Sequence, residues 1–317
     1  VDDLGWRDVG SFGSDFYDTP NIDRLAKEGI KFTHAYAASH VCSPTRASIM
    51  TGKYPARLHL TDWLGGRRSY AFESLTSPDF LQELPLEEST IAEAFKAHGY
   101  ATAHIGKWHL GEDPFGPLEQ GFDMRVPNWN KGWPNAGYYA PFELDGVEDE
   151  PGQYLTDRLT DYAKDFISEN QGQPFFLYMS HFAVHDPIHG RPDLVEKYRQ
   201  KLASMDPSNS PPFLLEGNPD DPQPLTNEQL VSLIDLPPYQ DYKVLPERTV
   251  KIKQHQDNIE FAAMVESMDE SLGRIVDHID QLGLTDNTLI VFFSDNGGMS
   301  GANFGGASRV VDSSRLD

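Results

Sequence analysis

A helix followed by an apolar strand recurs along this chain, and this order constrains the fold more than any other feature. Helices are expected at residues 90–99, 154–170 and 258–282, and the strands that follow them at 99–105, 174–180 and 288–293. Strands that alternate with helices form a mostly parallel sheet, and continuous apolar runs are typical of strands buried on both faces. The sequence therefore predicts an α/β fold with a mostly parallel central sheet flanked by helices on both faces.

Polar side chains able to do chemistry follow each expected strand. Lys107 and His109 follow the first strand, His185 the second, and Asp295 and Asn296 the third. Open parallel sheets bind ligands beyond the carboxyl ends of their strands. We therefore expect these side chains to gather at one edge of the sheet.

Each of these groups also has a plainer interpretation. The Asp–Asn pair can form an ordinary turn, and the lysine and the first histidine can be surface residues. His181 and His189 compete with His185, which is preferred for its position relative to Pro187. The agreement of all the groups with one architecture carries more weight than any one of them.

Cys42 is the only cysteine in the chain, so an internal disulfide and a cysteine-rich zinc site are excluded. A helix is expected directly after it, with Ser43 as the cap, Pro44 as the first helical residue and an end at Gly52. The thiol would then lie at a helix N-terminus, where backbone N–H groups favour an anion. Arg46, about one turn further on, can add a planar fork of donors for a tetrahedral oxyanion.

The charge of the chain limits its partners. With 26 basic and 49 acidic residues the formal net charge is −23, which argues against a nucleic-acid surface. An anionic substrate would be repelled by this field, so its enzyme must place cations at the site and recruit a metal. Solubility in salt is the plainer explanation of the charge. No apolar stretch of about 18 residues occurs, so no membrane span is expected.

Five sets of residues together resemble the sulfatase family of the alkaline-phosphatase-like superfamily. They lie at 2–5, 42–55, 106–111, 181–187 and 294–298, in family order and over nearly the whole chain. The resemblance implies an alkaline-phosphatase-like fold and an enzyme, a sulfuric ester hydrolase. The stretches 52–63 and 266–284 are similar to bacterial arylsulfatases and sulfatases of sulfated sugars, which implies a sulfated saccharide or an aryl sulfate as substrate.

In that family the motif cysteine is oxidised to formylglycine by a maturation enzyme, the formylglycine-generating enzyme or an equivalent. By resemblance, Cys42 is the precursor of the nucleophile: one hydroxyl of its hydrated aldehyde attacks sulfur, and the second allows release of sulfate. The resemblance further implies that Arg46 holds the ionised nucleophile and that Lys107 grips a sulfate oxygen. His109 would take a proton during release, and His185 would contact the bridging oxygen and protonate the leaving alcohol.

The resemblance also implies a calcium site. Asp2, Asp3, Asp295 and Asn296 match the family's ligands, and residue 42 donates a further oxygen. Carboxylate and amide oxygens suit Ca²⁺, with Mg²⁺ as the possible substitute, better than a softer metal.

Residues 128–139 form an aromatic, glycine-interrupted stretch that follows the Lys107 motif. The rings of Trp129 and Trp133 can stack on sugar rings, so we expect a carbohydrate-binding lip there. A packed surface loop is the alternative.

Two departures from the family pattern bear on domain organisation. Only Val1 precedes the Asp pair, where the family has an apolar strand, and the last lysine is Lys253, so a second active-site lysine downstream of Asn296 is missing, as is the C-terminal subdomain. We therefore expect residues 1–317 to be one catalytic domain truncated at both ends, with 185–250 as a surface excursion, and weak activity or instability of this chain alone. The expected compartment, by resemblance, is periplasmic or secreted.

Two other functions stay open. The first is a phosphodiester or phosphonate monoester hydrolase of the same superfamily, because phosphate and sulfate share a tetrahedral shape. The second is a non-catalytic relative that binds sulfated glycans. A cysteine-based protein phosphatase is disfavoured, because the four-residue step from Cys42 to Arg46 is too short for a phosphate loop.

Overall fold

The computed structural model describes most of the chain. The described residues are 1–66, 75–206, 213–216, 250–298 and 301–302, together with Gln223, Leu225, Thr226, Glu228, Gln229 and Ser232.

The central sheet is parallel, as predicted. Its strand order is β2-β1-β3, formed by β1 (Ala101–Gly106), β2 (Met124–Val126) and β3 (Phe175–Ser180). The helix α4 (Ile91–Ala97) leads into β1, and α5 (Leu155–Asn170) leads into β3. Both helices begin within one residue of their expected starts. The capping box of Thr90 and Glu93 fixes the start of α4.

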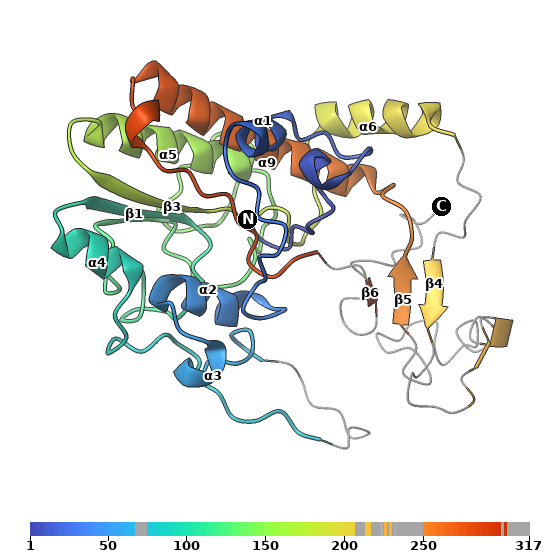
Figure 1. Ribbon diagram of the computed structural model, residues 1–317, viewed down its shortest axis with the longest axis horizontal. Coiled ribbons are helices and arrows are strands. Elements are labelled where there is room, and N and C mark those ends of the chain that lie inside the picture. Colours follow the sequence, from blue (N-terminus) through green and yellow to red (C-terminus); the bar gives the residue numbers. More distant parts are fainter. Residues whose placement is uncertain are drawn as a thin grey trace.

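Helices cover both faces of this sheet (Figure 1). On one face lie α5 and the long α9 (Ile259–Gln281), against which α1 (Pro20–Glu28) and α6 (Pro192–Ser204) pack. On the other face lie α2 (Cys42–Thr51) and α4, with α3 (Pro55–Leu58) next to α2. Two short 3-10 helices, Gly10–Phe12 and Thr285–Asn287, also lie in the described part of the chain.

Strand β3 shows why both faces are needed. Leu177 and Met179 pack into the larger core, which α5 and α9 share, whereas Phe176 and Tyr178 pack into a smaller core beneath α2 and α4. Successive side chains of a strand point to opposite faces, so an apolar run of this kind buries both.

The segment 288–293 differs from the prediction of a buried strand. It is extended but not paired as a strand, and its side chains alternate between half-buried and exposed, with Leu289 at 89% and Val291 at 75% exposure. Apart from a bond from Thr288 N to Thr285 O, its backbone partner among the described residues is Val1. The Val1 amino group donates to Phe293 O at 3.0 Å, and its carbonyl accepts from Asp295 N, just beyond the segment, at 3.1 Å. One paired residue is too little to cover both faces of the segment.

The start of α2 also differs from the prediction. The helix begins at Cys42 itself, after an extended Val41, and the Ser43 side chain does not cap it. Instead the Ser43 hydroxyl accepts a hydrogen bond from Leu64 N at 3.1 Å, which ties the helix to the following loop. The predicted end is confirmed, since Gly52 adopts the left-handed conformation that closes the helix.

The region 185–250 is described only in part. Its helix α6 buries Leu194, Val195 and Tyr198 in the larger core, so this stretch is more than a surface excursion. Three strands form a second, antiparallel sheet in the order β4-β5-β6, with bounds Phe213–Glu216, Val250–Lys253 and Gly301–Ala302. Residues 207–212 and most of 217–249 lie outside the described residues. No helix in the described part of the chain is both long and apolar enough for a membrane crossing.

Candidate active site

The site lies where the first residues of the chain meet the segment after 293. Asn296 Nδ2 donates to Asp3 Oδ1 at 2.7 Å, and Asp3 N donates to Asp295 Oδ1 at 3.3 Å. A further bond joins Ser294 Oγ to Leu4 O at 2.7 Å. The acidic and amide side chains predicted to share a site are therefore in direct contact.

Buried charges surround Cys42. Asp2 and Lys107 are both fully buried and form an ion pair. Burial is the largest effect and raises the pKa of Asp2, but Lys107 and the other neighbouring cationic groups together outweigh it and leave that pKa below its ordinary value. For Lys107 burial acts against the charged form, yet the Asp2 carboxylate raises its pKa. Both groups are therefore charged at neutral pH.

Arg46 is held by protein groups on every side. Its Nε and Nη2 contact Asp295 Oδ2 at 3.0 and 2.9 Å, and its Nη1 donates to Lys107 O at 2.7 Å and to Ser180 Oγ at 2.5 Å. Its Nη2 also lies 3.7 Å from Asp2 Oδ1. The guanidinium thus contacts four segments of the chain, and its donors are directed at these acceptors rather than at open space.

Cys42 is the first residue of α2 and is only 8% exposed. Burial, with the charge of Asp2 as the next cause, raises the pKa of its thiol to about 12. The helix N-terminus that the sequence indicated is present, but burial and the nearby carboxylates outweigh it. The unmodified side chain is a protonated thiol at neutral pH and hence a weak nucleophile.

Of the three candidate histidines in 181–189, His185 is the one at the site. Its Nε2 lies 3.7 Å from Asp3 Oδ2, and its Nδ1 contacts Asp186 O at 3.1 Å. A carbonyl only accepts, so Nδ1 carries a proton and Nε2 faces the site. His181 instead contacts Ser271 Oγ, and the backbone of His189 contacts the Met264 sulfur.

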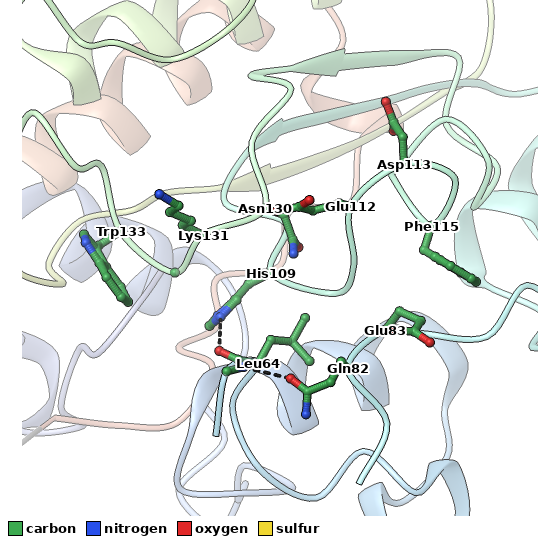
Figure 2. Close-up of a pocket in the computed structure, with 12 residues that line it drawn as sticks. Leu64, Gln82, Glu83, His109, Glu112, Asp113, Phe115, Asn130, Lys131 and Trp133 are labelled. Carbon is green, nitrogen blue, oxygen red and sulfur yellow. Dashed lines mark hydrogen bonds between the residues drawn. The ribbon is translucent and has the colours of Figure 1, made fainter. Parts of the chain in front are cut away.

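His109 is buried, and its ring has one hydrogen-bond partner among the described residues. Its Nε2 lies 3.4 Å from Leu64 O (Figure 2), which requires the proton on Nε2 and leaves the Nδ1 lone pair without a partner. Burial, followed by the positive charge of Lys107, lowers the pKa of His109 well below its ordinary value. The ring is therefore a neutral imidazole able to accept a proton.

The donor set fits a hard divalent cation. One carboxylate oxygen from each of Asp2, Asp3 and Asp295 lies within 4.8 Å of the others, and a second group joins Asp2, Cys42 and His185. Two buried oxygens there, Asp2 Oδ1 and Asn296 Oδ1, accept no hydrogen bond from the described residues, and the nearest cation to the first is Arg46 Nη2 at 3.7 Å. Burial and the charge of Asp2 raise the pKa of Asp295 against the opposing effect of Arg46, as expected when carboxylates crowd together in a buried site.

A cavity of about 380 Å³ lies beside His109. Trp133 and Lys131 line one side, and Phe115 and Glu83 line the other (Figure 2). The two tryptophans proposed for a lip differ here. Trp133 is 37% exposed and lines the cavity, whereas Trp129 packs against the larger core and donates from Nε1 to Trp133 O at 3.1 Å.

Ser180 and Tyr138 contact the site residues but lie outside the motifs that predicted the site. Ser180 is the last residue of β3; it accepts from Arg46 and donates to Lys107 O at 2.9 Å. Tyr138 is fully buried, and its hydroxyl donates to His185 O at 2.9 Å. Position at a strand end was the available signal for Ser180, and the aromatic loop was the signal for Tyr138.

Comparison with known proteins gives the same family as the motifs. The family model "Sulfatase" matches residues 1–312. The N-acetylgalactosamine-6-sulfatase of Mus musculus is 30% identical over 329 residues, which cover 97% of this chain and 51% of that protein. The chain thus spans about half the length of this curated relative.

Solved structures agree on the fold. The structure titled "Ps i-CgsB in complex with k-i-k-neocarrahexaose" superposes with a TM-score of 0.64 at 27% identity, covering 96% of this chain and 59% of the other. The phosphonate monoester hydrolase of Agrobacterium radiobacter gives a TM-score of 0.56 at 21% identity, with coverages of 92% and 60%, and shows the fold alone. The predicted alkaline-phosphatase-like α/β fold is confirmed. The family match over residues 1–312 and the shared fold show that the chain belongs to the sulfatase family.

Proposed function

We propose that this protein hydrolyses sulfate esters at the site around Cys42. The observation that carries the proposal is the burial of Lys107 and Arg46 among the carboxylates beside that residue. Two cations fixed in a water-poor site provide a preorganised field for a tetrahedral oxyanion. In a chain of net charge −23, this is where an anion would be accepted.

The state of Cys42 supports a need for modification. A thiol with a pKa of about 12 is a poor nucleophile at neutral pH. The formylglycine hydrate that a maturation enzyme makes in this family would supply a hydroxyl nucleophile and a built-in route for sulfate release. This proposal also explains why the residue lies at the helix start, among groups that stabilise developing negative charge.

The cation would be Ca²⁺, or Mg²⁺ in its place, held by Asp2, Asp3, Asp295 and Asn296 with residue 42. When bound, it would neutralise the carboxylates and polarise oxygens at the reacting centre. Arg46 keeps Asp295 in place, and Lys107 supplies a fixed positive charge next to residue 42.

The two histidines divide the proton transfers. His109 accepts a proton at Nδ1, its unpartnered nitrogen. In this step His185 carries a proton on each ring nitrogen and gives the one on Nε2, the nitrogen that faces the site, to the leaving alcohol. The cavity beside His109 would hold that alcohol, with the exposed ring of Trp133 against a sugar. A sulfated saccharide is therefore the proposed substrate class, in keeping with the sugar sulfatase among the relatives.

The first test asks whether Cys42 is modified. After co-expression with a formylglycine-generating enzyme, the peptide that contains Cys42 should be about 18 Da lighter than its thiol form. Cys42→Ala is the matched control and should show neither the mass change nor activity. An unmodified thiol would favour the non-catalytic, glycan-binding alternative.

The second test measures hydrolysis of 4-nitrophenyl sulfate, 4-nitrophenyl phosphate and a phosphonate monoester by the matured protein. Sulfate should be preferred, removal of divalent cations should abolish the activity, and Ca²⁺ or Mg²⁺ should restore it. A preference for either phosphorus ester would replace the proposal with the hydrolase alternative. The periplasmic or secreted compartment stays a prediction.

A further inference from the structure

The loop that carries Trp133 contacts both histidines of the site. Gly132 lies so close to His109 that an added Cβ would be 2.8 Å from its Cε1 and 3.1 Å from its Nδ1. The next residue, Trp133, stacks on the His185 ring with centroids 6.2 Å apart and planes 12° apart. One short segment therefore touches both rings to which the mechanism assigns proton transfers.

The same loop also holds the backbone of His185. The Tyr138 hydroxyl donates to His185 O at 2.9 Å from a fully buried position. On the site side, Asp2 fixes the preceding turn, because Val184 N donates to Asp2 O at 2.8 Å. Trp133 therefore stacks on the ring of His185, and Tyr138 hydrogen-bonds to its carbonyl.

The loop is itself rigidly supported. Trp129 Nε1 donates to Trp133 O at 3.1 Å, which closes the turn around Gly132. The ring of Tyr138 stacks on the ring of Tyr154, with centroids 5.8 Å apart. The loop can therefore impose a geometry on the histidines rather than follow them.

We propose that Gly132, Trp133 and Tyr138 form a histidine clamp, a set of positioning residues that fixes His109 and His185 in register with each other. The inference rests on the proposed function, because it assigns the clamp to the two proton-transferring groups. Accurate placement matters for proton transfer, since a shift of about 1 Å can cost about 100-fold in rate. The clamp residues act through the histidines and do not themselves transfer protons.

Tyr138→Phe is the sharpest variant, because it removes one hydroxyl and keeps the buried ring. Its effect should depend on the leaving group. For an alkyl or sugar sulfate, whose alcohol must be protonated, we expect kcat to fall roughly 10- to 100-fold. For 4-nitrophenyl sulfate, whose phenolate leaves more readily without a proton, kcat should fall far less.

Tyr154→Phe is the matched control. It removes an equivalent buried hydroxyl, which donates to His189 O, a residue outside the site. It should change both esters by the same small factor. Equal losses on both esters in Tyr138→Phe, or the same selective loss in Tyr154→Phe, would overturn the clamp.

Gly132→Ala tests the other arm. The added methyl must displace His109 or the loop, so kcat should fall on both esters, because the release step is common to them. Gly172→Ala is the control, since a Cβ there would meet no atom within 4 Å. If Gly132→Ala keeps the wild-type kcat, Gly132 does not position His109, and this part of the proposal is overturned.

A spectroscopic readout separates the clamp from the activity. Histidine ring NMR signals at one pH, assigned by the loss of a signal in His185→Gln, should shift for His185 in Tyr138→Phe but not in Tyr154→Phe. If the matured wild-type protein hydrolyses neither ester, the proposed function fails, while this shift still decides the clamp. An unchanged His185 signal in Tyr138→Phe contradicts it.

Discussion

Two regions of this molecule are both built from ion pairs between basic and acidic side chains, but they differ in how deeply these side chains are buried. At the site, Asp2, Arg46, Lys107 and Asp295 form ion pairs with almost no exposed surface. Between α5, α6 and α9, arginines and acids pair at the surface: Arg191 with Glu270 at 2.6 Å, Arg274 with Asp157 at 3.1 Å, and Arg274 with Asp161.

The difference shows which ion pairs are kept for chemistry. Exposed pairs are screened by water and salt and contribute about 0–1 kcal/mol each. Buried pairs cost desolvation that apolar residues of the same size would not incur, so their presence calls for a functional reason. The larger apolar core already joins α5, α6 and α9, so the surface pairs add little to it.

The largest expected effect comes from Arg46→Met, which keeps the stem and removes the guanidinium. Asp295 would lose its cationic partner inside the protein, and Asp2 would keep only Lys107, so we expect a loss of about 3–5 kcal/mol in the free energy of unfolding. The kcat for a sulfate ester should fall roughly 100- to 1,000-fold. Urea unfolding and steady-state kinetics measure the two effects.

Arg46→Lys is the control, because it keeps the charge but lacks the planar fork that reaches Asp295, Lys107 O and Ser180. It should lie between Met and the wild type in both measurements. If Arg46→Met is as stable as the wild type, breaking the buried ion pairs costs no more unfolding free energy than breaking the surface ones.

The second effect concerns buried histidines. Burial lowers the pKa of His104 to about 3 and that of His181 to about 3, from 6.5. The folded state then binds fewer protons than the unfolded state between pH 6.5 and about 3. Their stabilisation is complete above pH 6.5 and is lost as the pH falls, by about 2 kcal/mol for each histidine at pH 5.

His104→Phe should flatten this pH dependence, because the new ring fits the aromatic contacts with Trp108 and Phe122 and does not titrate. The measurement is urea unfolding at pH 7 and pH 5, and the exposed His98→Asn is the control. An unchanged pH slope in His104→Phe would show that water or a partner compensates its charge.

The smallest effect is expected on the surface. Arg274→Gln breaks the contacts with Asp157 and Asp161 and should cost less than about 1 kcal/mol, and less still at high salt. Thermal unfolding at low and high ionic strength measures it. A loss as large as that of Arg46→Met would erase the contrast between the two regions.

Periodic apolar patterns predicted the helices and strands whose formation depends mainly on their own sequence. The helices α5 and α9 begin and end within about one residue of their expected bounds, and β1 and β3 lie where expected. The prediction of a buried strand at 288–293 was wrong, because burial of a strand depends on the elements packed beside it, which apolar content does not reveal. The three-residue β2 is too short to leave a pattern.

At the site, residue type and strand-end position were enough to bring together the acidic and cationic side chains. They were not enough for Ser180, Tyr138 and Gly132, which act through backbone carbonyls or close contacts that any sequence could make. Trp129 and Trp133 show the same limit. They share a type and a loop, yet one packs inside and the other lines the cavity.

The meeting of Leu4 with Ser294 and of Asp3 with Asp295 joins positions that stand 290 and 292 residues apart. Contacts so distant in sequence depend on the docking of both segments, and few of their bonds are local. A mutation that loosens either segment would scatter the oxygens of the site while the helices stay folded. In a screen of inactive variants, such a remote lesion would look like the loss of a reacting group, although every reacting group was still present.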